Sequence, residues 1–116
     1  MNNKQTTDTI MMIRPFKFGF NASTSKDNVY QNSFKKGVTC DDVSEQAIVE
    51  FDRFVDLLKS AGVNVVEFRD NGTYETPDSI FPNNWISTHA DGSIWLYPMC
   101  SANRRVERRQ DIIDFL

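Results

Sequence analysis

The residues best suited to chemistry stand in one short segment, residues 77–85, which reads Pro-Asp-Ser-Ile-Phe-Pro-Asn-Asn-Trp. Pro77 and Pro82 each fix φ and remove a backbone donor, so this segment is expected to be a shaped loop rather than a central strand. The polar and aromatic side chains that it presents are Asp78, Phe81, Asn83, Asn84 and Trp85. Such groups in a rigid loop could bind a small polar molecule, although Asp and Asn in turns also satisfy local backbone groups.

A second candidate is the arginine-rich segment 103–109, Asn-Arg-Arg-Val-Glu-Arg-Arg. Its guanidinium groups could grip a carboxylate by paired hydrogen bonds, or they could form a solvated helix face with Glu–Arg pairs. His89 is the only histidine, and it lacks the Cys–His spacing of a metal site. Cys100 has no nearby base in the sequence that would activate it as a nucleophile. The residues alone therefore predict no catalytic group and no metal ligand.

The composition limits the kinds of partner. The chain has 116 residues, enough for one small domain, with 40% hydrophobic and 25% charged residues, as in soluble globular proteins. Its net charge of −3 argues against a nucleic-acid partner, which requires a basic surface. Two cysteines are too few for a disulfide scaffold, so we expect reduced thiols in a cytoplasmic protein. No stretch resembles a signal peptide or a membrane span, so no membrane partner is expected.

A strand and a long helix are the first elements expected to position these segments. The apolar run 10–13, followed by an Arg-Pro pair that ends it, predicts a buried strand. Residues 42–61 have apolar side chains at helical spacing, with Asp42 and Glu45 as the predicted capping box and Gly62 as the terminating glycine. The apolar face of this helix is predicted to comprise Ile48, Phe51, Phe54, Val55, Leu58 and Ala61.

Two stretches show no clear periodicity. Residues 1–8 are polar and are expected to be disordered. Residues 16–40 mix aromatic side chains with polar ones, and a loop of that length in a compact domain is usually functional. The aromatic residues indicate that this loop packs against the rest of the chain.

A strand, a hairpin and a last helix are predicted for the remainder. Residues 63–68 are rich in β-branched side chains, which is typical of a strand. An Asp-Gly pair between residues 84–89 and 93–97 predicts a β-hairpin with those two arms. Residues 104–116 have helical character. The apolar side of that helix is predicted to comprise Val106, Ile113 and Leu116.

Several motifs in a consistent order resemble those of the guanidine-modifying superfamily. They lie at residues 12–15, 18–21, 77–85, 97–99 and 103–107. That superfamily includes arginine deiminases, dimethylarginine dimethylaminohydrolases and amidinotransferases, and the likeness is greatest to its citrulline-utilising hydrolases. The resemblance implies the pentein fold, an α/β propeller of ββαβ modules. The chain would form about one module and the start of the next. It would be the N-terminal part of an enzyme whose catalytic His and Cys lie beyond residue 116.

The same resemblance implies roles for individual side chains. Asp78 matches the position that holds the substrate α-amino group, and Phe81 matches the aromatic ring beside the guanidinium. Arg104 matches the arginine that grips the α-carboxylate, with Arg105 as the alternative. Asn84, next to Asn83, matches a position that is Asp in enzymes acting on arginine or methylated arginine. The complete predicted substrate-binding set is Asp78, Phe81, Asn83, Asn84, Arg104 and Arg105.

The amide at position 84 indicates the substrate class. A guanidinium group only donates hydrogen bonds, so an Asp partner suits it, whereas a ureido group has both a carbonyl acceptor and N–H donors. Asn84 complements a neutral ureido group without burying a charge. We therefore expect an enzyme that hydrolyses a C–N bond of a ureido amino acid, citrulline first, through a covalent Cys intermediate and without a cofactor.

Other readings of the resemblance stay open. They are an amidinotransferase, a deiminase-type enzyme acting on arginine or dimethylarginine, and a non-catalytic pentein binding module. Exposed module edges would also favour association between copies of the chain.

Overall fold

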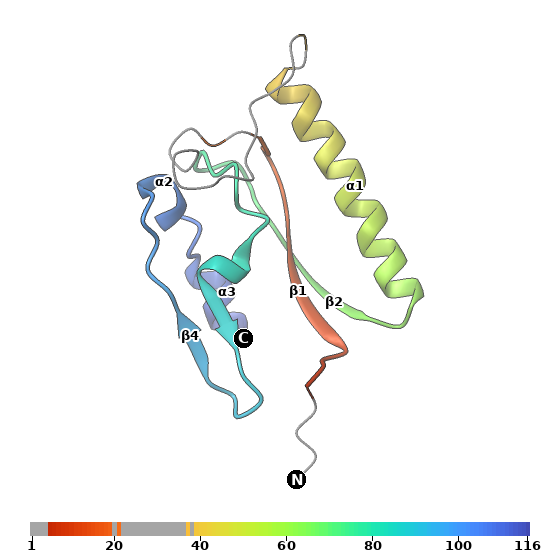
Figure 1. The fold of residues 1–116 in the computed structure, drawn as a ribbon, viewed down its shortest axis with the longest axis vertical. Helices are drawn as coiled ribbons and strands as arrows, with labels where there is room; N and C mark the ends of the chain where they lie inside the picture. Colours follow the sequence, from red (N-terminus) through yellow and green to blue (C-terminus); the bar gives the residue numbers. More distant parts are fainter. Residues whose placement is uncertain (1–4, 20, 22–36, 38) are drawn as a thin grey trace.

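A two-stranded parallel sheet and its crossover helix form the frame of the protein (Figure 1). Strand β1 (Thr9–Arg14) pairs with strand β2 (Asn64–Arg69) along the whole length of both. Helix α1 (Cys40–Ser60) supplies the crossover that parallel pairing requires. The two predicted strands and the predicted helix between them are confirmed, and so is the mixed α/β class.

The structure is a computed structural model that describes residues 5–19, 21, 37 and 39–116. The irregular segment expected over residues 16–40 lies mostly outside these residues, and so does the first half of the N-terminal stretch 1–8. Just before β1, the Asp8 carbonyl accepts a hydrogen bond from the Asn64 N–H at 2.8 Å. The pairing with β2 therefore begins ahead of the first strand residue.

Helix α1 begins earlier than predicted, and the predicted capping box of Asp42 and Glu45 is wrong. Thr39 is the N-cap, and its hydroxyl accepts a hydrogen bond from the Asp42 N–H at 3.1 Å. The Asp42 carboxylate in turn accepts from the Thr39 N–H at 3.1 Å. Asp42 thus takes the role usually filled by Glu or Gln at the third helical position. Threonine and aspartate both suit a helix start, so local sequence alone does not separate the two registers.

The end of α1 confirms the predicted glycine stop. Gly62 has φ of +88°, a left-handed conformation that glycine adopts without steric cost. Its N–H donates to the Lys59 carbonyl, and the Val63 N–H donates to the Leu58 carbonyl, each at 3.0 Å. These two bonds form a Schellman motif, which satisfies carbonyl groups at the helix end.

The layers lie on opposite sides of the β1–β2 pair. Figure 1 shows α1 on one side and the segment from β3 to α3 on the other. On the α1 side, Val55 is buried and Arg14 of β1 bonds Asp52 at 2.8 Å. Phe54 was predicted to pack but is 52% exposed, because a two-stranded sheet covers only a narrow stripe of the helix. The core on the other side is formed by Ile13, Trp85, Ile86 and Ile112.

A hairpin shorter than predicted follows the proline-flanked loop. Residues Pro82–Asn84 form a 3₁₀ turn, after which strand β3 (Ile86–Thr88) pairs antiparallel with β4 (Ile94–Leu96). The predicted first arm is therefore wrong over its first two residues, because Pro82 starts a helical turn instead. Trp85 ends that turn and is fully buried, so it belongs to the core rather than to a binding surface.

The single last helix predicted for residues 104–116 is also wrong. The structure has two short helices, α2 (Ala102–Arg105) and α3 (Gln110–Phe115). The break between them lets Glu107 and Ile112, which are both buried, turn toward the interior. In one straight helix, Glu107 and Ile112 would not lie on the predicted apolar side of the helix. Val106 and Leu116, which belong to that stripe, are exposed.

Candidate functional site

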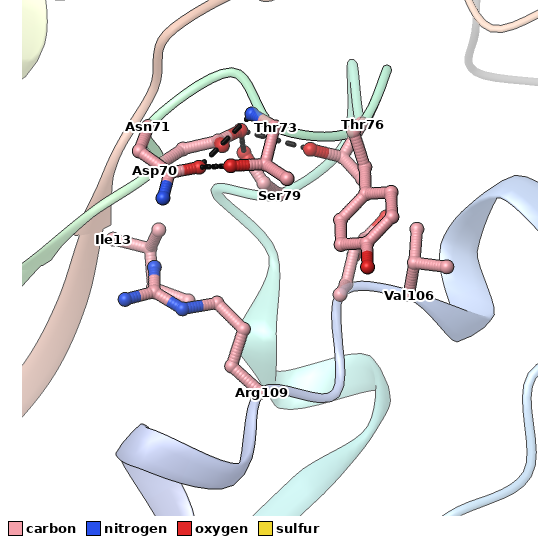
Figure 2. Close-up of a pocket in the computed structure, with 10 residues that line it drawn as sticks. Ile13, Asp70, Asn71, Thr73, Thr76, Ser79, Val106 and Arg109 are labelled. Carbon is pink, nitrogen blue, oxygen red and sulfur yellow. Dashed lines mark hydrogen bonds between the residues drawn. The ribbon is translucent and has the colours of Figure 1, made fainter.

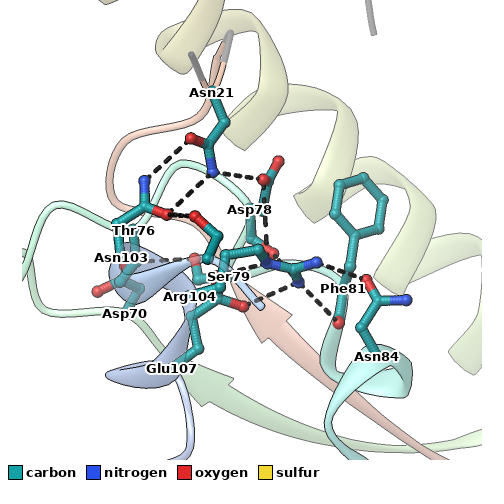
Figure 3. Close-up of polar contacts among 11 residues, drawn as sticks. Asn21, Asp70, Thr76, Asp78, Ser79, Phe81, Asn84, Asn103, Arg104 and Glu107 are labelled. Atoms are coloured by element: carbon teal, nitrogen blue, oxygen red, sulfur yellow. Dashed lines mark hydrogen bonds and ion pairs between the residues drawn. The ribbon is translucent and has the colours of Figure 1, made fainter. Parts of the chain in front are cut away.

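The side chain of Arg104 is the centre of a polar cluster beneath the proline-flanked loop (Figure 3). It donates Nε–H to Glu107 Oε2 and Nη2–H to Glu107 Oε1, both at 3.0 Å. Its Nη1 donates to Asn84 Oδ1 at 2.8 Å. A further Nη2 contact reaches the carbonyls of Asp78 and Phe81, each at 3.4 Å. One guanidinium therefore connects α2 to both ends of the segment from residue 78 to residue 84.

Asp78 is the carboxylate of this cluster and is itself buried. Its Oδ2 accepts a hydrogen bond from Asn21 Nδ2 at 2.7 Å and lies 3.9 Å from Arg104 Nε. Asn21 is also buried, and its Oδ1 accepts from Asn103 Nδ2 at 2.9 Å. Three distant parts of the chain thus meet at one carboxylate. Such a fully connected network holds the Asp78 side chain in a single orientation.

The loop that carries Asp78 is anchored to the end of β2. Asp70 directly follows that strand, and its Oδ2 accepts hydrogen bonds from the hydroxyls of Thr76 at 2.8 Å and Ser79 at 2.9 Å. The Asp70 N–H donates to the carbonyl of Arg14, the last residue of β1, at 2.9 Å. The cluster therefore lies at the carboxyl edge of the parallel pair, where α/β proteins commonly bind ligands.

Glu107 balances the charge of Arg104 inside the protein. Burial raises the pKa of the Glu107 carboxyl above its usual value near 4.5. The hydrogen bonds and positive charge of Arg104 oppose that rise, and the nearby carboxylates of Asp78 and Asp70 add to it. Its side chain is 1% exposed and that of Arg104 is 12% exposed. The ion pair is therefore largely removed from water. In such a place, removing one partner leaves a buried charge uncompensated and destabilises the protein.

Four of the six predicted substrate-binding residues come together in this cluster. Asp78 and Asn84 each contact the Arg104 guanidinium, as does the Phe81 carbonyl, while the ring of Phe81 extends away from the guanidinium (Figure 3). Phe81 is 42% exposed and makes an edge contact with Phe18, with ring centres 6.4 Å apart. The exposed ring of Phe81 is available for packing against a flat group.

The other two predicted residues lie elsewhere. Arg105 donates to the carbonyls of Met99 at 2.9 Å and Cys100 at 2.8 Å, which fixes the turn before α2. Asn83 lines a separate hollow together with Ile10 and Val66. The structure therefore favours Arg104 over Arg105 as the guanidinium of the cluster.

A cavity of about 210 Å³ adjoins the cluster on the side of Glu107 (Figure 2). Its lining includes Asp70, Thr76, Ser79, Glu107 and Arg109. Arg109 reaches toward the loop after β2 and donates to the Arg69 carbonyl at 2.7 Å. The cavity is smaller than the roughly 300–1,000 Å³ of typical ligand pockets. Most of the polar groups in its walls are hydrogen-bonded to the loop. We therefore interpret the cavity as part of the structure that holds the loop, and not as a ligand pocket.

Sequence reasoning missed Asn21, Asn103 and Glu107 as members of the cluster. Glu107 stands three residues after Arg104, the spacing of an intrahelical ion pair, and this was the available signal. The residues next to these three in the sequence do not indicate how far they are buried. Their burial results from the packing of α2 under the loop. Asn21 lies 57 positions from Asp78, and no local pattern predicts that contact.

The described part of the chain shows no metal centre in the cluster. His89 lies on the hairpin, where its Nε2 is 3.0 Å from the Ser87 hydroxyl and its ring is tilted against Trp95. Within residues 5–19, 21, 37 and 39–116, no three His, Cys, Asp or Glu side chains gather as metal ligands would. None of the helices described there has the length and apolar character needed to cross a membrane.

The mixed α/β fold and the sequence motifs are consistent with a domain of the pentein superfamily of guanidine-modifying proteins. Residues 14–116 match the family described as N,N dimethylarginine dimethylhydrolase, eukaryotic. The match covers most of the 116 residues, and the chain belongs to this family of hydrolases. No curated protein and no solved structure matches the chain.

Proposed function

We propose that the protein hydrolyses a C–N bond of a ureido or guanidino amino acid, with citrulline as the first candidate. The observation that carries this proposal is the contact between Arg104 and Asn84 beside the buried carboxylate of Asp78. A charged amino acid head needs both a cation and an anion, and these are Arg104 and Asp78. A neutral ureido end needs a neutral hydrogen-bonding group, and Asn84 is that group.

Each residue has a definite role in this proposal. Asp78 accepts hydrogen bonds from the α-ammonium group of the substrate. Arg104 binds the α-carboxylate through the second N–H of Nη1, whose other hydrogen is donated to Asn84. The exposed ring of Phe81 packs against the flat ureido group. Binding both ends of the amino acid fixes the position of the reacting carbon, which accounts for much of the rate gain in such enzymes.

The proposed reaction is covalent catalysis by a thiolate with a histidine as acid and base. For citrulline, the thiolate adds to the ureido carbon and ammonia leaves. Water then displaces the thiolate, and the resulting carbamate loses carbon dioxide to give ornithine. One citrulline and one water thus become ornithine, carbon dioxide and ammonia. No metal or organic cofactor enters this balance.

A second candidate substrate is dimethylarginine, which the description of the matching family favours. In that case dimethylamine leaves in place of ammonia, and the product is citrulline. An amide at position 84, in place of a carboxylate, argues for citrulline over dimethylarginine, because a cationic guanidinium is better matched by a carboxylate.

The test compares three substrates with the purified full-length protein. Citrulline, dimethylarginine and arginine are supplied at equal concentrations, and ammonia, dimethylamine, ornithine and citrulline are quantified over time. We expect ornithine and ammonia to form fastest from citrulline. Faster release of dimethylamine from dimethylarginine would establish the second candidate, and no product from any of the three would refute the proposed function.

A further inference from the structure

The side-chain amide of Asn84 has a fixed orientation. All nitrogen atoms of Arg104 are donors, so the Asn84 atom that lies 2.8 Å from Arg104 Nη1 must be the oxygen. The Asn84 nitrogen therefore points away from Arg104, and Figure 3 shows it on the outer side of the cluster. The group that faces a ligand is thus an NH₂ donor. It pairs with a carbonyl acceptor and repels a guanidinium, which offers only donors.

Glu107 sets the direction of this contact. It engages Arg104 along the edge formed by Nε and Nη2, with both bonds at 3.0 Å. Paired bonds of this kind fix the plane of the guanidinium as well as its position. With that edge occupied, Nη1 is the nitrogen turned toward Asn84.

We propose that Glu107 is a specificity-determining positioning residue, which acts through Arg104 to turn the NH₂ group of Asn84 toward the ligand. The inference rests on the proposed function and adds to it the residue that decides between ureido and guanidino substrates. Glu107 touches no substrate in this scheme. Its contribution appears as discrimination between two ligands, whereas a residue needed only for folding would affect both ligands alike.

The test measures kcat/KM for citrulline and for arginine with the full-length protein and expresses them as a ratio. The Glu107→Gln variant keeps the shape of the side chain but loses its charge and one acceptor. Arg104 is then released from its fixed plane, and the Asn84 amide is able to rotate. We expect the ratio to fall about tenfold or more, since one charge-assisted hydrogen bond contributes roughly this factor.

A double-mutant cycle separates this relay from a general loss of structure. Asn84→Asp replaces the amide with a carboxylate whose two oxygens are equivalent, so its orientation no longer matters. That variant should favour arginine. In its background, adding Glu107→Gln should leave the ratio unchanged.

A second variant guards against misfolding of Glu107→Gln. Arg104→Lys keeps the positive charge, but a single ammonium group does not reproduce the geometry of the fork, so the ratio should fall again. Arg108→Lys is the matched control, because Arg108 is exposed and lies in the same segment. It should leave the ratio as in the wild type.

The outcomes are distinguishable. If the wild type turns over citrulline better than arginine but Glu107→Gln keeps the same ratio, the positioning role is overturned and the proposed function stands. If the wild type prefers arginine, the orientation argument is overturned while C–N hydrolysis stands. If neither compound is turned over but dimethylarginine is, the positioning role is overturned while C–N hydrolysis stands. If none of the three compounds is turned over, both proposals are overturned.

Discussion

Glu107 and Arg104 form a two-point ion pair that is almost completely removed from water, with both hydrogen bonds at 3.0 Å. Glu107 and Arg104 are only three residues apart in sequence, yet Arg104 bonds to a loop that lies 20 to 23 residues earlier in the chain. Because burial outweighs the attraction of Arg104, the pKa of the Glu107 carboxyl is raised. Burying an ion pair of this kind carries a desolvation cost, which good geometry must offset.

This raised pKa predicts a pH dependence of stability. A carboxyl whose folded-state pKa exceeds its unfolded value contributes stability below the unfolded pKa and loses it as pH rises through the folded pKa. The free energy of unfolding of the wild type should therefore fall, relative to Glu107→Gln, from about pH 4.5 upward. Urea unfolding of both proteins between pH 4 and about 8 measures the difference.

The carboxyl of Asp52 does not disturb that measurement. The hydrogen bond from Arg14 lowers the pKa of Asp52, so its contribution is lost as pH falls below the unfolded value of 3.8. That loss is common to wild type and variant and cancels in the difference. A difference that grows in favour of the wild type as pH rises would contradict the burial argument.

Asn21 should be required for the stability of the cluster. Asn21→Ala removes the donor to Asp78 at 2.7 Å and the acceptor for Asn103 at 2.9 Å. Because both partners are left partly unsatisfied, we expect a loss of about 1–3 kcal/mol in the free energy of unfolding. Asn64→Ala is the control, since that exposed side chain has only a 3.5 Å contact with Thr9. Equal effects of the two changes would argue against the buried network.

Much of the frame was predictable, because it depends on local patterns. The two strands of the parallel pair are short runs rich in apolar and β-branched residues, and α1 has apolar residues at helical spacing and a glycine at its end. The loop of residues 77–85 was recognisable from its two prolines and its motif. These features need no knowledge of distant contacts.

The errors have tertiary causes. Helix 104–116 was predicted as one piece because its residues favour a helix, but burial of Glu107 and Ile112 breaks it in two. The sequence places Trp85 among the candidate site residues, whereas the structure buries it completely in the core. No local pattern predicts the contact between Asp78 and Asn21, because the two residues are 57 positions apart in the sequence.

The corrected start of α1 gives a simple stability test. Thr39→Ala should lower the free energy of unfolding by about 0.5–2 kcal/mol, because the Asp42 N–H loses its cap. Glu45→Ala should change it by less than about 0.5 kcal/mol, since Glu45 is exposed on the helix surface. Thermal unfolding of both variants decides between the two possible capping boxes. A larger effect at Glu45 would restore the box expected from sequence.

The proposed role of Asp78 predicts an effect on substrate binding rather than on chemistry. Asp78→Asn retains an oxygen that accepts from Asn21 Nδ2, so the fold should persist. The lost negative charge weakens the grip on an α-ammonium group, and KM for citrulline should rise about 10- to 100-fold with a smaller change in kcat. Steady-state kinetics of the full-length protein, with exposed Asp114→Asn as control, provide the measurement. A variant with unchanged KM and reduced kcat would place Asp78 at the reacting end of the substrate instead.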